Sequence, residues 1–227
     1  MPLLRKKAQA FDLQIQDFLL RVNAPQEFYE ECRAAALSMW EQLQSYSIRS
    51  TEFRTSRRPV EVPDSAPPVV REMAAAAAAA GVGPVYTIQG ALTDHVGRYL
   101  ARGLPDVIIS SGGDYFMRSR KRMKLPVYRA MDGTGLSVIV DSRKAPAGVS
   151  TNVGSAQLRA SNVDGLAVVA ASCMLADAAA AAAMAILTRQ HSFPKALAWL
   201  RRIDGVHGAV VVRGNDIGVA GAVEVAA

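Results

Sequence analysis

Two long alanine runs set the strongest limits on how this chain of 227 residues can fold. The first covers Ala74–Ala80, and the second, Ala178–Ala183, follows directly after one acidic residue, Asp177. Alanine has the highest helix propensity and adds almost no bulk, so each run predicts a helix whose backbone can lie close to its neighbours. We therefore expect tightly packed helices, with Asp177 as the exception in an apolar stretch.

The other segments predict a sheet formed between these helices. Apolar residues at helical spacing predict a helix over 24–46, and a polar, proline-containing arm follows it. The glycines of "GVGP" end the helix that starts near Pro67, and Pro84 can open the next one, to about Arg102. Ser192 is a candidate N-cap for a helix over 192–203. Strands are predicted at 106–110, 115–119, 135–141 and 165–172, with a hairpin at 207–226.

This order of elements favours an α+β fold, in which a mostly antiparallel sheet packs with alanine-rich helices. We expect a single domain over residues 1–227. Residues 1–65 would supply an N-terminal helix and an extended arm, and residues 66–227 would form the core.

The net charge and the two cysteines indicate which binding partners and which cellular compartment suit this protein. The net charge of +6 suits anionic small molecules as well as nucleic acid. The basic run Arg118–Lys124 has no interleaved aromatics, so we interpret it as a solvated hairpin loop and expect no nucleic-acid partner. Cys32 and Cys173 match no metal or redox spacing; we expect both to be buried and reduced, as in a cytoplasmic protein.

A membrane span is the alternative reading of Gly165–Leu187, which is almost entirely apolar. Its central Asp177 would cost about 2.5–3.5 kcal/mol on insertion, and many of its residues are alanine. We therefore expect a buried strand followed by a helix, and no membrane partner.

Several motifs together resemble one family. "APPVVREMAAAAAAAGVGPVYTIQGALTDHVGRYL", "IISSGGDYF", "GVSTNVG", "LADAAAAAAMAI" and "GAVVVRGNDIGVAG" occur in the order typical of a small branch of the ApbE-like superfamily. The resemblance covers nearly the whole chain. It implies an ApbE-like fold and points to flavin transferases, which move FMN from FAD to a protein threonine with Mg²⁺.

The resemblance also assigns a metal ligand. The superfamily places a threonine four residues after its metal-binding aspartate, so that both oxygens face one cation. Asp177 matches the aspartate, but Ala181 stands at the threonine position and cannot ligate a metal. One carboxylate with a carbonyl and waters could still hold Mg²⁺. The alternative for Asp177 is a carboxylate in the first turn of its helix, favoured there by the helix dipole.

The other candidate ligand-binding residues lie in polar turns that match the family. Gly112 and Gly113 allow a backbone turn close to a ligand, and Asp114 could accept a hydrogen bond from it. Thr151, Asn152 and Gly154 offer hydroxyl, amide and backbone donors, unless they form only a polar loop. Asp164 precedes a strand and is either a site carboxylate or a turn residue.

The helix after "GVGP" departs from the family in its polar residues. Tyr86, Gln89 and Thr93 share one helical face, with Asp94 and His95 beside it. This stripe is either an exposed face or a remodelled pocket wall with Tyr86 or His95 as an acid or base. For an enzyme, we assign catalysis to Asp177, Tyr86 and Asp94, and ligand binding to Gln89.

Three functions are consistent with these residues. The first is a flavin-transferase-like enzyme that binds an anionic or nucleotide-like small molecule, with Mg²⁺ and with FAD or FMN by resemblance. The second is a hydrolase or lyase acting on a small cyclic metabolite in the same pocket. The third is a non-catalytic ligand-binding or assembly protein, and the alanine helices and terminal hairpin leave room for a homodimer.

Overall fold

A large antiparallel sheet forms the centre of the computed structural model, which describes residues 10–129, 135–151 and 163–227. Its eight strands follow the order β1-β2-β3-β4-β7-β8-β9-β10, and every neighbouring pair is antiparallel. The strands are β1 (Ala10–Ile15), β2 (Phe18–Asn23), β3 (Val107–Ser111), β4 (Asp114–Arg118), β7 (Ala147–Thr151), β8 (Gly165–Ala170), β9 (Val206–Arg213) and β10 (Asp216–Gly221).

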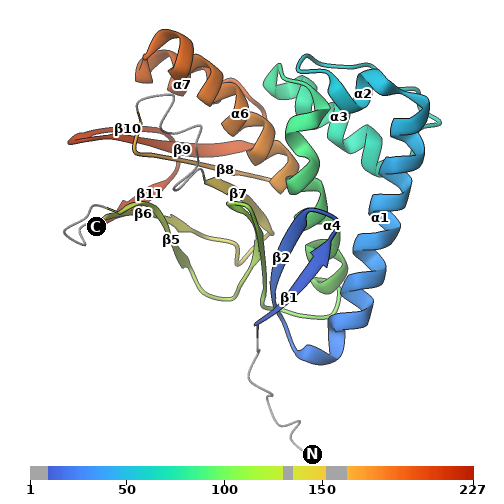
Figure 1. The fold of residues 1–227 in the computed structure, drawn as a ribbon. Helices are drawn as coiled ribbons and strands as arrows, with labels where there is room; N and C mark the ends of the chain where they lie inside the picture. Colours follow the sequence, from blue (N-terminus) through green and yellow to red (C-terminus); the bar gives the residue numbers. More distant parts are fainter. Residues whose placement is uncertain (1–9, 130–134, 152–162) are drawn as a thin grey trace, which may run out of the picture.

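A smaller sheet and a helical layer cover the two faces of this large sheet (Figure 1). The smaller sheet has the order β11-β6-β5. Its strands are β5 (Met123–Arg129), β6 (Gly135–Val140) and β11 (Glu224–Ala226). The helical layer contains η1 (Gln26–Phe28), α1 (Tyr29–Arg49), α2 (Thr51–Thr55), α3 (Pro68–Ala80), η2 (Pro84–Thr87), α4 (Ile88–Leu100), α6 (Cys173–Gln190) and α7 (Phe193–Leu200).

Alternation along β8 shows how the layers share the core. Leu166 and Val168 pack with the alanines of α6, whereas Ala167 and Val169 pack against residues of the smaller sheet. Successive side chains of a strand point to opposite faces, so a strand between two apolar layers is buried at every position, as β8 is. The α+β class and the mostly antiparallel sheet are confirmed.

The expected tight helix packing is also confirmed. A Cβ placed on Gly90 of α4 would lie 2.5 Å from the backbone carbonyl oxygen of Cys173 at the start of α6. No side chain fits between the two helices there, so their backbones are in direct contact. Ala77 of α3 and Ala179 of α6 are fully buried in the core beside this contact.

Two predicted helix ends are confirmed. Gly81 has a φ of 72° and ends α3 in the left-handed conformation. The Ser192 side chain accepts a hydrogen bond from the Lys195 N–H and caps α7.

The segment 165–187 divides into strand β8 and helix α6, and none of the helices in the described ranges combines the length and apolar content needed to cross a bilayer. Cys32 and Cys173 are buried and free.

Three parts of the fold differ from the predictions. Strands β1 and β2 were not predicted, although β1 alternates buried Phe11, Leu13 and Ile15 with exposed residues. The basic segment does not form a hairpin loop, because β4 pairs in the large sheet and β5 in the smaller one. The arm after the first helix is not wholly extended: α2 forms in it because the Ser50 hydroxyl accepts a hydrogen bond from the Phe53 N–H.

Candidate functional site

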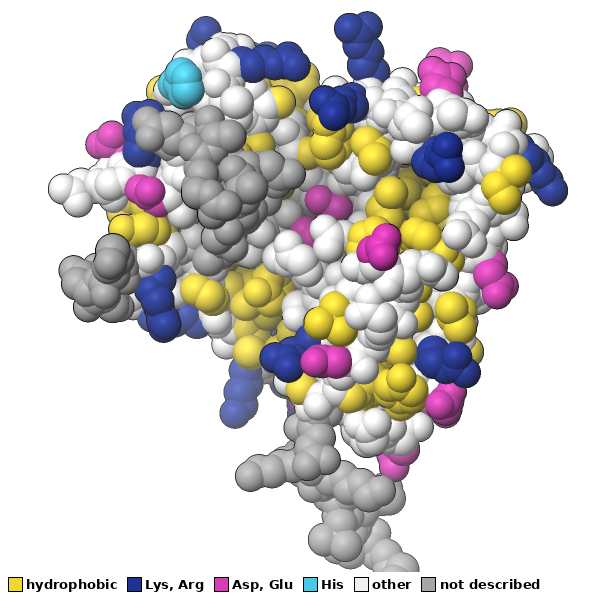
Figure 2. All heavy atoms as spheres, in the orientation of Figure 1, with side chains coloured by type: hydrophobic (Ala, Val, Ile, Leu, Met, Phe, Trp, Pro, Cys, Tyr) yellow, Lys and Arg dark blue, Asp and Glu magenta, His cyan; other side chains and the backbone are white. Residues whose placement is uncertain are grey.

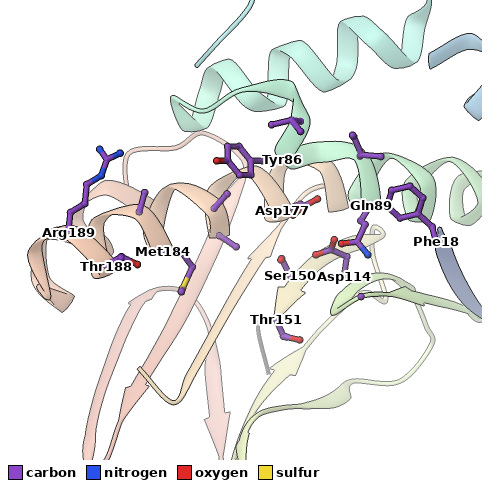
Figure 3. Close-up of a pocket in the computed structure, with 16 residues that line it drawn as sticks. Phe18, Tyr86, Gln89, Asp114, Ser150, Thr151, Asp177, Met184, Thr188 and Arg189 are labelled. Carbon is purple, nitrogen blue, oxygen red and sulfur yellow. The ribbon is translucent and has the colours of Figure 1, made fainter. Parts of the chain in front are cut away.

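A pocket of about 570 Å³ opens where the first half of α4, the exposed face of α6 and the ends of β4 and β7 meet. Figure 3 shows side chains from all these elements pointing into it. Figure 2 shows acidic side chains at the floor of a hollow on this face of the molecule. The lining consists of Phe18, Val85, Tyr86, Ile88, Gln89, Gly112, Asp114, Ser150, Thr151, Asp177, Ala180, Ala181, Met184, Ala185, Thr188 and Arg189.

Asp177 lies in the second turn of α6 and is not a first-turn carboxylate. The helix begins at Cys173, its N-cap is Ser172, and its first turn contains no acidic residue. The first-turn interpretation of Asp177 is therefore wrong. Instead, its Oδ2 accepts a hydrogen bond of 3.3 Å from the backbone N–H of Gly90 in α4. The structure thus places this carboxylate where α4 begins, with the rest of the side chain facing the pocket.

The alanines after Asp177 give the pocket a low wall. Ala181 stands one turn after Asp177 on the same face of α6, and Ala185 stands one turn further. Methyl groups at these positions leave space above the helix and offer no ligand to a cation. The polar groups of this wall are therefore at its two ends, with Asp177 at one end and Thr188 and Arg189 at the other.

The predicted glycine turn places Asp114 opposite Asp177. Gly112 and Gly113 have φ values of 56° and 105°, in the left-handed region that favours glycine. A Cβ on Gly112 would lie 2.0 Å from Nε2 of Gln89, and one on Gly113 would lie 2.2 Å from the backbone oxygen of Thr151. Both glycines are thus needed for the turn and for the close approach of its neighbours.

Asp114 and Asp177 form a hydrogen-bonded carboxyl pair at the floor of the pocket. Burial raises the pKa of Asp114, and the charge of Asp94 adds to this rise. Burial raises the pKa of Asp177 well above its ordinary value, and the charge of Asp114 adds to that rise. Two carboxyl groups at hydrogen-bonding distance need a shared proton or a cation between them, since both cannot stay charged without one.

Ser150 supports this pair and was missed in the sequence. Strand β7 pairs with β4 so that Ser150 lies opposite Asp114, and the Ser150 hydroxyl hydrogen-bonds to the Asp114 carboxyl. The segment containing Ser150 was interpreted either as a ligand-binding segment or as a polar loop, and Ala147–Thr151 is a strand. In a strand, the partner of each residue is set by the register, which the sequence of one strand does not reveal.

Asp94 lies outside the pocket lining and holds the start of α6. Its Oδ1 accepts a hydrogen bond of 2.9 Å from the Cys173 N–H, and its Oδ2 accepts one of 3.1 Å from the Met174 N–H. Burial raises the pKa of Asp94, while these two bonds and Arg98 act in the opposite direction. Asp94, which was predicted as a catalytic residue, thus caps the first turn of α6 from the neighbouring helix α4, in addition to the N-cap residue Ser172.

The remaining predicted residues divide between the pocket and other places. Tyr86, Gln89 and Thr151 line the pocket. Thr93 is buried and donates to backbone oxygens of its own helix, and His95 is outside the lining. Asp164 stabilises a turn, because its Oδ2 accepts a hydrogen bond of 2.6 Å from the N–H of Gly214 between β9 and β10. Asn152 and Gly154 lie outside the described residues.

Phe18, Thr188 and Arg189 line the pocket but were not predicted. Phe18 belongs to β2, which was not predicted as a strand, so nothing indicated its position. Thr188 could have been found from helical spacing, because it continues the face of α6 that contains Asp177, and Arg189 is its neighbour in the chain. Arg189 makes no ion pair with any residue in the described ranges.

The oxygen atoms at the pocket floor fit a hard cation such as Mg²⁺. Within the described residues, no three His, Cys, Asp or Glu side chains gather as a complete metal cage. Mg²⁺ keeps several waters and is often held by one or two carboxylates, a number that Asp114 and Asp177 can supply. Asp114 is buried and Asp177 is half-buried, and the two are in contact, so a divalent cation would remove the repulsion between them when both are ionised.

A family model described as "AbpE bacteria" matches residues 2–198. The chain belongs to this ApbE-like family. It is 28% identical to a UPF0280 protein of Methanocella arvoryzae over 212 residues, which cover 92% of this chain and 86% of that protein. A UPF0280 protein of Methanopyrus kandleri is also 28% identical, over 90% of this chain and 86% of its own length.

Solved ApbE structures share the fold of this family member. The ApbE protein of Thermotoga maritima superposes with a TM-score of 0.56 at 11% identity, covering 93% of this chain and 97% of its own. A mutant of the flavin transferase ApbE from Vibrio cholerae superposes with a TM-score of 0.51 at 14% identity, over 96% and 98% of the two chains. These similarities confirm the ApbE-like fold.

Proposed function

We propose that the pocket binds an anionic, nucleotide-like small molecule together with Mg²⁺, and that the protein is an enzyme of the flavin-transferase type. The observation that carries this proposal is the contact between Asp114 and Asp177 at the floor of a pocket that is also lined by Arg189. The family and the fold support an enzyme-like ligand-binding protein. FAD is the first ligand to test, because solved relatives are named flavin transferases.

The two ends of the pocket suit different parts of such a ligand. Asp177 and Arg189 are twelve residues apart on α6, which corresponds to about 18 Å along the helix axis. Asp114 and Asp177 would hold the cation, and Arg189 would contact an anionic group of the ligand at the other end. The alanine wall between them accepts a flat apolar body without a steric clash.

Bound Mg²⁺ would neutralise the negative charge of the ligand's phosphate groups. The protein's own residues would do the rest. Asp114 and Asp177 would hold the cation, and Ser150 and the Gly90 N–H each fix one of these carboxyl groups. Tyr86 and Gln89 also line the pocket and can donate hydrogen bonds to the ligand. Ala181 removes the hydroxyl ligand of the superfamily, so we expect weaker cation binding than the threonine would give.

Calorimetry with FAD tests this proposal. The protein should bind FAD with Mg²⁺ present, and a chelator should weaken that binding. Asp177→Asn keeps an oxygen for the Gly90 N–H but removes the charge, so it should reduce the effect of Mg²⁺. Arg189→Gln should weaken FAD binding, whereas Arg201→Gln, at an exposed position outside the pocket, should not. Absence of FAD binding with Mg²⁺ contradicts the flavin version of the proposal.

A second candidate is acid–base catalysis by a hydrolase or lyase. The raised pKa values of Asp114 and Asp177 favour it, because a protonated carboxyl beside an ionised one can act as acid and base. Tyr86 lines the same pocket and could assist. This candidate predicts turnover of a small cyclic metabolite in the presence of a chelator. Unchanged turnover in Tyr86→Phe would remove Tyr86 from the mechanism.

A further inference from the structure

A second cavity, of about 350 Å³, lies among α1, α2, α3 and the start of α4. Its walls are largely apolar and include Leu43, Phe53, Met73 and Ile88. The volume is within the range of small-molecule sites, which are mostly apolar with a few placed polar groups. None of the residues that we assign to the first pocket's chemistry lines this second cavity.

Four side chains with polar groups line this second cavity: Trp40, Gln44, Ser47 and Arg54. Trp40 lines the cavity, and its Nε1 is buried without a hydrogen-bond partner among the described residues. The indole N–H can only donate. Because this nitrogen has almost no accessible surface, a ligand in the cavity would contact the ring of Trp40 and not its N–H group.

Arg54 is the charged residue of this lining, and it stands at the exposed side of the cavity. The Arg54 side chain makes no ion pair or hydrogen bond with any residue in the described parts of the chain. A guanidinium presents its N–H groups in a planar fork that matches a carboxylate. The cavity thus joins an apolar interior to a cation at its mouth.

From the unpaired guanidinium of Arg54 and the apolar walls, we propose that the second cavity binds a small monocarboxylate with an apolar chain. The chain would pack between Leu43, Phe53 and Met73, and the carboxylate would accept hydrogen bonds from Arg54. A neutral molecule of the same chain length would use the walls but offer Arg54 no negative charge. Charge complementarity at the mouth of the cavity therefore favours the carboxylate over the neutral molecule.

The second cavity also adjoins the first pocket. Ile88 lines both, and the ring of Trp40 packs against Phe18 of the first pocket with a centroid distance of 5.6 Å. Figure 2 shows hydrophobic side chains gathered beside the acidic hollow, over the helices on the right of the view. Ile88 and the ring pair therefore belong to the wall between the two cavities.

Tryptophan fluorescence tests this proposal directly, because the chain contains two tryptophans. Trp199 lies on α7, so Trp199→Phe leaves Trp40 as the single reporter. In that background, octanoate below its micelle concentration should change the fluorescence saturably. Octanol should bind at least about tenfold more weakly than octanoate, because it cannot form the charge-assisted hydrogen bond to Arg54. Absence of a saturable octanoate signal overturns the proposal.

Two variants distinguish binding in the second cavity from binding elsewhere on the protein. Arg54→Ala should weaken octanoate binding about tenfold and leave octanol binding unchanged, whereas Arg57→Ala, another exposed arginine nearby in the chain, should change neither. Equal binding of octanoate to Arg54→Ala and its parent overturns the proposal. Asp177→Asn should leave the octanoate titration intact, so a failure of the FAD experiment and a failure here are distinguishable.

Discussion

Asp94 and Asp177 each accept backbone hydrogen bonds from the first turn of the helix that carries the other. Asp94 of α4 accepts from Cys173 and Met174 of α6, and Asp177 of α6 accepts from Gly90 of α4. The first turn of a helix has N–H groups without partners inside the helix, so each carboxylate satisfies donors that the other helix leaves free. The two helices are fixed together at the point where the carboxyl pair of the pocket is held.

Removing the Asp94 carboxylate should destabilise the protein. Asp94→Ala leaves the Cys173 and Met174 N–H groups buried without acceptors, so we expect a loss of about 2–4 kcal/mol in the free energy of unfolding. Asp94→Asn keeps one acceptor oxygen and should lose less. Urea denaturation measures both. Asp204→Ala, at an exposed aspartate, is the control and should stay within about 0.5 kcal/mol of the wild type.

The two glycines before Asp114 should differ in their tolerance of alanine. Gly112→Ala meets the end of the flexible Gln89 side chain, which can move, so we expect a loss of about 1–2 kcal/mol from backbone strain. Gly113→Ala meets the backbone oxygen of Thr151, which cannot move without disturbing β7, and should cost about 2–4 kcal/mol.

Gly103→Ala is the matched control for these variants. No atom lies within 4 Å of a Cβ at Gly103, and its φ is not in the left-handed region. Thermal and urea unfolding should therefore place Gly103→Ala near the wild type. A larger loss for Gly112→Ala than for Gly113→Ala would contradict the described turn.

The carboxyl pair should make stability depend on pH in a metal-free sample. The folded pKa of Asp114 and Asp177 is raised by burial, so the folded state binds protons more tightly than the unfolded state. This contribution is complete below the unfolded pKa, about 3.9, and is lost as pH rises through the raised folded values. The free energy of unfolding due to the pair should therefore fall as pH rises from about 4.

Asp114→Asn provides the comparison for this pH dependence. An amide can donate a hydrogen bond to Asp177 at any pH, so the variant should lose less stability than the wild type as pH rises. If Mg²⁺ replaces the shared proton, it should likewise reduce the loss of stability that the wild type shows as pH rises. Parallel pH profiles for the wild type and Asp114→Asn in urea denaturation would show that the pair does not share a proton.

Restoring the hydroxyl of the superfamily should strengthen cation binding. Ala181→Thr places an oxygen one turn after Asp177 on the same face of α6, and we expect Mg²⁺ affinity to rise about tenfold in calorimetry. Ala185→Thr, one turn further along the same pocket wall, adds the same group too far from Asp177 to share its cation. If both variants, or neither, bind Mg²⁺ more tightly, the metal assignment at Asp177 is contradicted.

Local signals were sufficient for much of this fold. The alanine runs, the left-handed Gly81 and the cap at Ser192 act within a few residues, so the sequence shows them directly. The turn of Gly112 and Gly113 before Asp114 is local in the same way. Strand β1 could also have been predicted, since its apolar residues alternate with polar ones.

The relationships between distant elements could not be predicted from the sequence. Ser150 contacts Asp114 because of the register between β7 and β4, and the two strands are far apart in the chain. Asp94 is polar on a packed helix, which suggested a pocket residue. Only the position of α6 beside α4 shows that its partners are backbone N–H groups.

The reciprocal bonds between α4 and α6 also have a kinetic consequence. They join residues 79, 80 and 87 positions apart, so the chain must close long loops before any of them can form. Contacts of such separation form slowly, because the entropy of the intervening chain is lost before the contacts stabilise it. A nascent chain that ends before Cys173 lacks all three bonds, so the ligand pocket matures only after most of the protein has been synthesised.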